Sequence, residues 1–195
     1  VENFNDQGLV NIKASKESGL PKGIPIRYRA GDQPNNAMSL NVLNSGEIAA
    51  TGGTSGVLYG LTDNLKSKEY LRINNFAHVN YSQTNKLIGK LLCLNGAGIQ
   101  YKWIKNLTSN ASYLEMNKKA SNINIGSNDL SIFPFGNGAE RIFNNKNVGS
   151  SISNINYNIH SSSHLLRASL EGIAFSFIYG MEILINDNMK LSLIR

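Results

Sequence analysis

Residues 48–59 hold the feature that most constrains the fold, because two short apolar segments flank a turn made only of small residues. The turn reads Gly52-Gly53-Thr54-Ser55-Gly56, so no bulky side chain shields its backbone N–H groups. Glycine also allows the positive φ angles that tight turns need. The pattern predicts a β-hairpin whose turn can bind phosphate oxygens. An ordinary tight turn has the same composition and remains the alternative.

An acidic residue precedes this hairpin by about the length of a short helix. Asp32 follows the apolar segment 24–28 and a glycine, which predicts a strand whose end projects the carboxylate into a cleft. Pro34 suits the first turn of a helix with Ala37, Leu40 and Leu43 on its apolar face, which residues 44–46 end. Asp32 would then lie at a helix N-terminus, where partial positive charge favours the ionised carboxylate that a base requires. A helix cap is the other role that an aspartate takes at this position.

The rest of the chain alternates between strand-like and helix-like segments, which is typical of an α/β domain. The periodicity predicts strands at 76–81, 86–94 and 130–135, and helices at 99–107, 111–123 and 164–184. Gly96 and Gly98 precede the first of these helices on the carboxyl side of a strand, where open α/β sheets bind ligands. The last helix is apolar around nearly its whole circumference and is therefore expected to be the central buried one.

Composition narrows the possible partners and compartment. Hydrophobic residues make up 41% of the 195 residues, which is enough for a core. No apolar run approaches the roughly 20 residues that cross a bilayer, and the first residues lack a signal-peptide pattern, so we expect a cytoplasmic protein without a membrane partner. The formal charge of +6 comes from scattered lysines, which argues against nucleic acid and suits a small polyanion such as a nucleotide. The three histidines lack metal-ligand spacing, and no metal-binding residue is predicted.

Six segments in a fixed order resemble the FGGY family of carbohydrate kinases. They are residues 19–26, 30–37, 50–56, 75–78, 130–141 and 164–175. The resemblance covers nearly the whole chain and implies an actin-like, ribonuclease H-like ATPase fold with a mixed sheet and flanking helices. It also implies two domains: residues 1–45 as the tail of a sugar-binding domain, and residues 46–195 as most of a nucleotide-binding domain, truncated at its end. The chain would then be an incomplete fragment of a two-domain kinase, inactive by itself.

The resemblance also implies a reaction in which ATP phosphorylates a sugar. Asp32 would bind the sugar and, as general base, take the proton from the C5 hydroxyl of D-xylulose while that oxygen attacks the γ-phosphate, with Mg²⁺ offsetting the phosphate charge. The products would be D-xylulose 5-phosphate and ADP, and the full-length protein could form a homodimer. Two alternatives remain: a kinase for another polyol such as ribulose or glycerol, and a non-catalytic actin-like ATP-binding protein.

Nucleotide-binding residues follow from the same resemblance. In the family a glycine shortly before a tryptophan contacts ATP, and the spacing to Trp103 selects Gly98. A second register would select Gly96 and Gln100 instead, so this loop stays open. With the hairpin included, the residues expected to bind ATP are Gly53, Thr54, Ser55 and Gly98.

Overall fold

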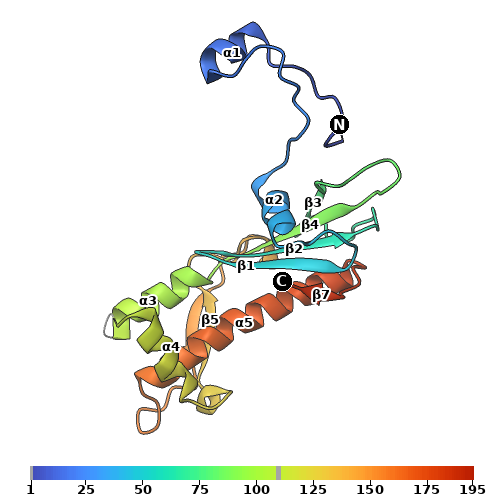
Figure 1. The fold of residues 1–195 in the computed structure, drawn as a ribbon. Helices are drawn as coiled ribbons and strands as arrows, with labels where there is room; N and C mark the ends of the chain where they lie inside the picture. Colours follow the sequence, from blue (N-terminus) through green and yellow to red (C-terminus); the bar gives the residue numbers. More distant parts are fainter. Residues whose placement is uncertain (1, 109–110) are drawn as a thin grey trace.

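A computed structural model describes residues 2–108 and 111–195, and a five-stranded sheet lies at its centre (Figure 1). The strand order is β3-β4-β2-β1-β7. The strands are β1 (Glu47–Gly52), β2 (Gly56–Thr62), β3 (Asn74–Ala77), β4 (Ile88–Leu94) and β7 (Leu193–Ile194). Strands β1 to β4 pair antiparallel, whereas β7 pairs parallel with β1. The predicted mixed sheet is therefore confirmed.

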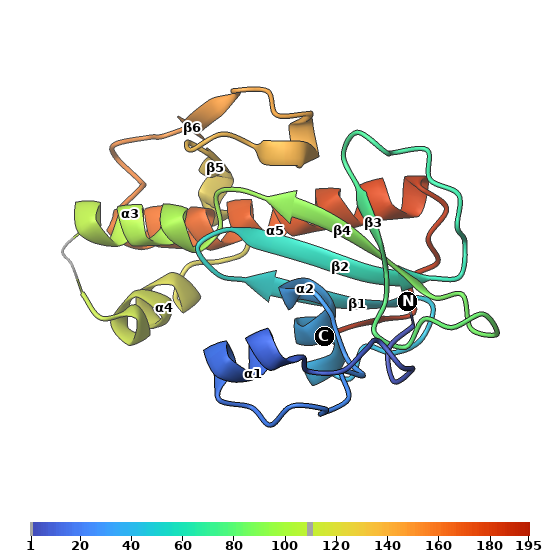
Figure 2. The same ribbon diagram turned by 90° about the horizontal axis from the view of Figure 1, so that it is seen from above.

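Helices cover both faces of this sheet, α2 (Asp32–Ser39) on one and α5 (Ser162–Asn186) on the other (Figures 1 and 2). Successive residues of a strand point to opposite faces, and β1 shows this clearly. Ile48 belongs to the core that includes α5, while Ala49 packs with Ala37 of α2. Because both faces are covered, the central strands β2 and β4 are apolar in most positions rather than in every second one.

The segment between β4 and α5 forms a lobe at one end of the sheet. Its elements are α3 (Gly98–Thr108), α4 (Tyr113–Ser121), the short 3₁₀ helices Ser127–Asp129 and Glu140–Phe143, and the antiparallel pair β5 (Ser131–Phe135) and β6 (Gly149–Ser153). The lobe packs on the first half of α5. A Cβ atom at Gly172 would lie 2.2 Å from the carbonyl oxygen of Ile132, so the close approach of α5 to β5 requires glycine there.

Helix α5 is only partly buried, contrary to the prediction of a helix surrounded by core. Its buried residues form one stripe: Leu166, Ala168, Ser169, Gly172, Ser176, Gly180, Ile183 and Leu184. Phe175, Ile178 and Ile185 are exposed on other sides. Apolar composition alone does not reveal which side another element covers. By length and composition α5 would also pass as a membrane span, a test that core helices of soluble proteins pass as well.

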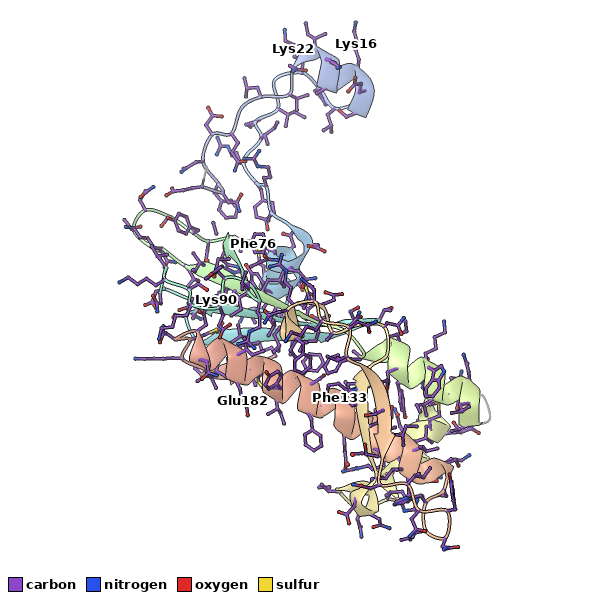
Figure 3. The ribbon with its side chains drawn as sticks, turned by 180° about the vertical axis from the view of Figure 1, so that it is seen from behind. Lys16, Lys22, Phe76, Lys90, Phe133 and Glu182 are labelled. Carbon is purple, nitrogen blue, oxygen red and sulfur yellow. The ribbon has the colours of Figure 1, made fainter. Side chains whose placement is uncertain are left out.

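Residues 2–31 form an arm that extends away from the sheet (Figure 1). Its far end holds α1 (Ile12–Ser18), which includes Lys16, and the turn at Lys22 (Figure 3). The prediction of a sheet strand at 24–28 is wrong. The segment instead makes a narrow ribbon with residues 4–10, in which the N–H of Val10 donates to the carbonyl of Ile24 at 2.9 Å. Pro25 has no N–H to donate, which limits regular pairing here.

Candidate active site

The glycine-rich turn connects β1 to β2, as predicted. The strands stay in register up to the pair Gly52 and Gly56, and the N–H of Gly53 closes the turn on the carbonyl of Ser55 at 3.0 Å. Thr54 is exposed at the tip. Within the described ranges, the N–H groups of Thr54 and Ser55 have no acceptor. Two neighbouring free donors in a turn of small residues are the arrangement that binds anionic oxygens.

The close approach of this turn to α3 accounts for the glycine at position 98. The N–H of Gly98 donates to the carbonyl of Gly53 at 2.8 Å, and the N–H of Ile99 donates to that of Thr54 at 3.1 Å. The turn therefore satisfies the first donors of α3, and these donors are not free to hold a phosphate. A Cβ atom at Gly98 would lie 2.5 Å from the carbonyl oxygen of Gly53. Gly98 lets the turn sit against α3, while a direct contact with the nucleotide stays a prediction.

Gly98→Ala is accordingly expected to displace the turn and to raise the KM for ATP at least about tenfold, a loss of roughly 1.4 kcal/mol in binding. The measurement is steady-state kinetics of the full-length gene product with ATP as the varied substrate. Gly52→Ala is the matched control, because a Cβ atom at Gly52 would have no atom within 4 Å. Equal KM values for the two variants would contradict the role assigned to Gly98.

A chain of side-chain hydrogen bonds fixes the turn from the other side. The hydroxyl of Ser55 donates to Asn95 Oδ1 at 3.0 Å, and Asn95 Nδ2 donates to the carbonyl of Asn137 at 3.0 Å. The turn is thus attached to the loop that follows β5. Sequence reasoning missed Asn95, whose only signal is a polar residue directly after a buried strand.

Asp32 is the first residue of α2 and is exposed. Asn36, one helical turn later, donates through Nδ2 to Thr51 Oγ1 at 2.8 Å and so attaches α2 to β1 just before the glycine-rich turn. Residues four apart share one face of a helix. Asp32 therefore lies on the side of α2 that faces β1.

The environment of Cys93 places Asp32 at the same end of the sheet. Burial raises the pKa of the Cys93 thiol, and the carboxylates of Glu140 and Asp32 raise it further, whereas the guanidinium of Arg141 lowers it. Cys93 pairs with Val57, close to the start of β2. The Asp32 charge thus acts on the strand ends next to the turn. The thiol itself stays protonated at neutral pH and is a poor nucleophile.

A cavity of about 310 Å³ lies where the arm, α2, β3 and β4 meet. Asp32, Gln33 and Arg29 line it together with Phe76, which Figure 3 shows at the edge of the sheet beside α2. The side-chain oxygen Oε1 of Gln33 is buried and, among the described residues, has no hydrogen-bond donor. A buried acceptor without a donor is costly, and a ligand hydroxyl would satisfy it. Sequence reasoning did not single out Gln33.

Among the described residues, no three side chains of the His, Cys, Asp or Glu types cluster closely enough to hold a metal ion. Mg²⁺ in phosphoryl transfer keeps several waters and binds substrate phosphates with one or two carboxylates. An ion of this kind arrives with the nucleotide and needs no protein cage.

Comparisons with known proteins concern the whole chain. No family model matches the chain. The chain is 27% identical to a xylulose kinase of Haemophilus influenzae over 188 residues, which is 96% of this chain and 37% of that protein. It therefore spans little more than a third of the length of that relative.

Solved structures show the same relationship. The xylulose kinase from Rhodospirillum rubrum matches with a TM-score of 0.86 at 19% identity, over 99% of this chain and 38% of the other. The Plasmodium falciparum glycerol kinase with ADP matches with a TM-score of 0.78 at 22% identity, over 100% of this chain and 38% of the kinase. Sequence and fold together show that this chain is homologous, over nearly its whole length, to one stretch of the FGGY carbohydrate kinases, with their actin-like ATPase fold.

Proposed function

We propose that this chain carries the phosphoryl-transfer centre of an ATP-dependent sugar kinase. The observation that carries the proposal joins two features. One exposed carboxylate, Asp32, lines a cavity and lies on α2, which Asn36 attaches to β1 just before the glycine-rich turn. In that turn the N–H groups of Thr54 and Ser55 have no acceptor among the described residues. Phosphoryl transfer needs a proton acceptor for the attacking alcohol and donors that hold the phosphates in line. This end of the sheet offers both.

Each residue then has a defined task. Asp32 accepts the proton of the sugar hydroxyl as its oxygen attacks the terminal phosphorus, and the ADP leaves on the opposite side. The turn from Gly53 to Ser55 holds the phosphate oxygens, with Gly98 keeping the turn in place. Gln33 Oε1 accepts a hydrogen bond from a second hydroxyl of the sugar and so orients it. Mg²⁺, when bound with ATP, offsets the charge of the phosphates.

D-xylulose is the substrate we propose first, with D-xylulose 5-phosphate as product. The support is the similarity to the xylulose kinase of H. influenzae, which extends over 96% of the chain. A gluconokinase of Bacillus subtilis is also 27% identical and a glycerol kinase shares the fold, so gluconate and glycerol compete with D-xylulose, as does ribulose from the sequence analysis. The structure of that glycerol kinase is of the enzyme with ADP, which supports a nucleotide as the phosphate donor here. A homodimer and a cytoplasmic location stay predictions.

A non-catalytic ATP-binding protein is the candidate of a different class. Among the described residues Gln33 Oε1 has no donor, and Gln33 lines the same cavity as Asp32. This favours the kinase, because a hydroxyl of a second substrate would satisfy that acceptor.

The test is an assay of the full-length gene product with Mg-ATP and a panel of D-xylulose, ribulose, gluconate and glycerol. We expect one of these compounds to stimulate ADP release strongly, and D-xylulose to give the highest kcat/KM. Basal ATP hydrolysis that no compound in the panel stimulates would contradict the kinase proposal. A preference for gluconate, glycerol or ribulose would contradict only the choice of substrate.

A further inference from the structure

Asn3 links two walls of the cavity that holds Asp32. Its Nδ2 donates to the carbonyl of Val79 at 3.1 Å, and its Oδ1 accepts the backbone N–H of Arg29 at 2.8 Å. Asn3 and Arg29 line the cavity themselves, and Val79 lies two residues beyond Ala77, which lines it from β3. One amide thus joins the segment before Asp32 to the loop that follows β3.

The side chain of Asn3 has partners at both ends of its amide. It is half-buried, and Gln7 Nε2 also donates to its Oδ1, at 3.3 Å. An amide has an acceptor oxygen and a donor nitrogen, so these contacts fix which atom faces which partner. Val79 is buried, and among the described residues no other group donates to its carbonyl. Loss of the Asn3 amide would leave that acceptor unpaired, which is unfavourable.

The backbone just before Asp32 has few other attachments. In residues 28–31, only the N–H of Arg29 has an acceptor within the described chain, and that acceptor is Asn3. Asp32 Oδ1 accepts the N–H of Gln33 at 2.8 Å, and no other described group donates to this carboxylate. Because that contact is to the next residue, it moves with the helix. The place of the carboxylate in the cavity therefore depends on how residues 29–32 are held.

Asp32 lies between two points of attachment. Four residues after it, Asn36 bonds to Thr51 of β1, as described above. Three residues before it, Arg29 is held by Asn3. A general base must come within hydrogen-bond reach of the hydroxyl it deprotonates, and a misplacement of about 1 Å can cost about 10²-fold in rate. An exposed carboxylate fixed on both sides meets this requirement.

We propose that Asn3 is a positioning residue for phosphoryl transfer, which holds the chain before Asp32 so that the carboxylate stays aimed at the attacking hydroxyl. The inference rests on the proposed function, because it assumes that Asp32 is the base. The hydrogen bonds of Asn3 do not reach the turn from Gly53 to Ser55. Loss of Asn3 is therefore a loss in kcat, with the KM for ATP nearly unaltered.

Asn3→Ala in the full-length gene product is expected to lower the kcat of sugar phosphorylation about tenfold or more. Asn5→Ala is the matched control. Asn5 is an exposed residue of the same arm that donates to Glu2 Oε2 at 2.9 Å and does not line the cavity. A kcat for Asn3→Ala within a factor of about two of the control would overturn the proposal.

The same substitution in the Asp32→Asn background separates positioning from a general structural effect. If Asn3 acts through Asp32, Asn3→Ala has little further effect on kcat there, because residues that act as a unit are not additive. The same fold-loss in both backgrounds would overturn the positioning role. A normal kcat for Asp32→Asn alone would overturn the proposed function, whereas a loss for Asp32→Asn without one for Asn3→Ala would overturn this inference alone.

Amide hydrogen exchange of the unmodified full-length gene product tests the contact even if Asn3→Ala folds poorly. The N–H of Arg29 is expected to exchange more slowly, relative to its intrinsic rate, than the N–H of Ala30, which has no acceptor among the described residues. Equal protection of the two N–H groups would show that Asn3 does not hold this segment, and the proposal would be overturned.

Discussion

Asp32→Asn is expected to lower the kcat of sugar phosphorylation by about 10²- to 10⁴-fold, the range that a positioned general base contributes. Asparagine keeps the size of the side chain and its polarity, but it cannot accept the proton of the sugar hydroxyl. Because Asp32 is exposed at the start of α2, the substitution leaves the packing of that helix unchanged. The loss should therefore appear in kcat, with the KM for ATP nearly unaltered.

Asp63→Asn is the control for this experiment. Asp63 is also exposed, and its contact is a surface hydrogen bond from Ser45 Oγ at 3.2 Å. Both variants are compared with the unmodified full-length gene product in steady-state kinetics at saturating Mg-ATP. A kcat within a factor of about three of normal for Asp32→Asn would show that this carboxylate is not the base. The phosphate-binding role of the turn would then need a different proton acceptor.

Lys90→Met is expected to lower the free energy of unfolding by about 3–5 kcal/mol, the usual cost of removing one partner of a buried ion pair. Lys90 and Asp187 are both fully buried, and Lys90 Nζ lies 2.5 Å from Asp187 Oδ2 and 2.9 Å from the carbonyl of the same residue. Figure 3 shows Lys90 inside the body of the molecule, between the sheet and α5. Removing it leaves a carboxylate in the core without a counter-ion.

Asp187 makes the effect large because it also fixes a loop. It accepts hydrogen bonds from Ser67 Oγ at 2.8 Å and from the N–H groups of Lys68 and Glu69 at 2.5 and 2.9 Å. One side chain thus joins the end of α5 to the loop between β2 and β3. A domain stabilised by about 5–15 kcal/mol would lose a substantial part of its stability.

Lys13→Met is the matched control, because Lys13 pairs with Glu17 across 4.0 Å on the surface, where ion pairs contribute about 0–1 kcal/mol. Urea unfolding at neutral pH measures both variants. A loss below about 1 kcal/mol for Lys90→Met would contradict the importance of the buried pair.

The ion pair also predicts how stability changes with pH. Burial opposes ionisation of Asp187, but the hydrogen bonds from Lys90, Glu69, Ser67 and Lys68 outweigh it and hold the pKa of this carboxyl below its ordinary value. The folded state therefore binds this proton less readily than the unfolded state, so the stabilisation is complete above the unfolded pKa of about 3.9 and is lost as the pH falls through the folded pKa. Lys90→Met should weaken this acid dependence in the same unfolding measurements.

Local patterns in the sequence were sufficient for elements whose shape depends on near neighbours. Small residues between two apolar segments predict a tight turn between two strands, and the structure has this hairpin around Gly53. Pro34 and the spacing of the apolar residues after it predict α2. Strand β3 shows the limit of such patterns. It begins at Asn74 and includes Asn75, residues of low strand preference, because their backbones pair with β4.

The residues of the candidate site also fall into two groups, those that local sequence signals predict and those that only the structure identifies. Asp32 and the turn residues stood out in the sequence because an acid before a helix and a glycine-rich turn are local signals. Gln33 and Asn95 did not, because an amide becomes informative only when burial leaves it with a missing or a specific partner.

The sequence by itself determined the α/β class, the hairpin with its small-residue turn, and the position of Asp32 at a helix start, since each follows from backbone preference and from the spacing of apolar residues. Only the tertiary structure decided that Gly98 supports the turn, that Lys90 pairs with Asp187, and that one side of α5 is left exposed. The physical reason is that these properties depend on contacts between residues far apart in the chain, and the free energy of a buried group depends on the partner it meets there.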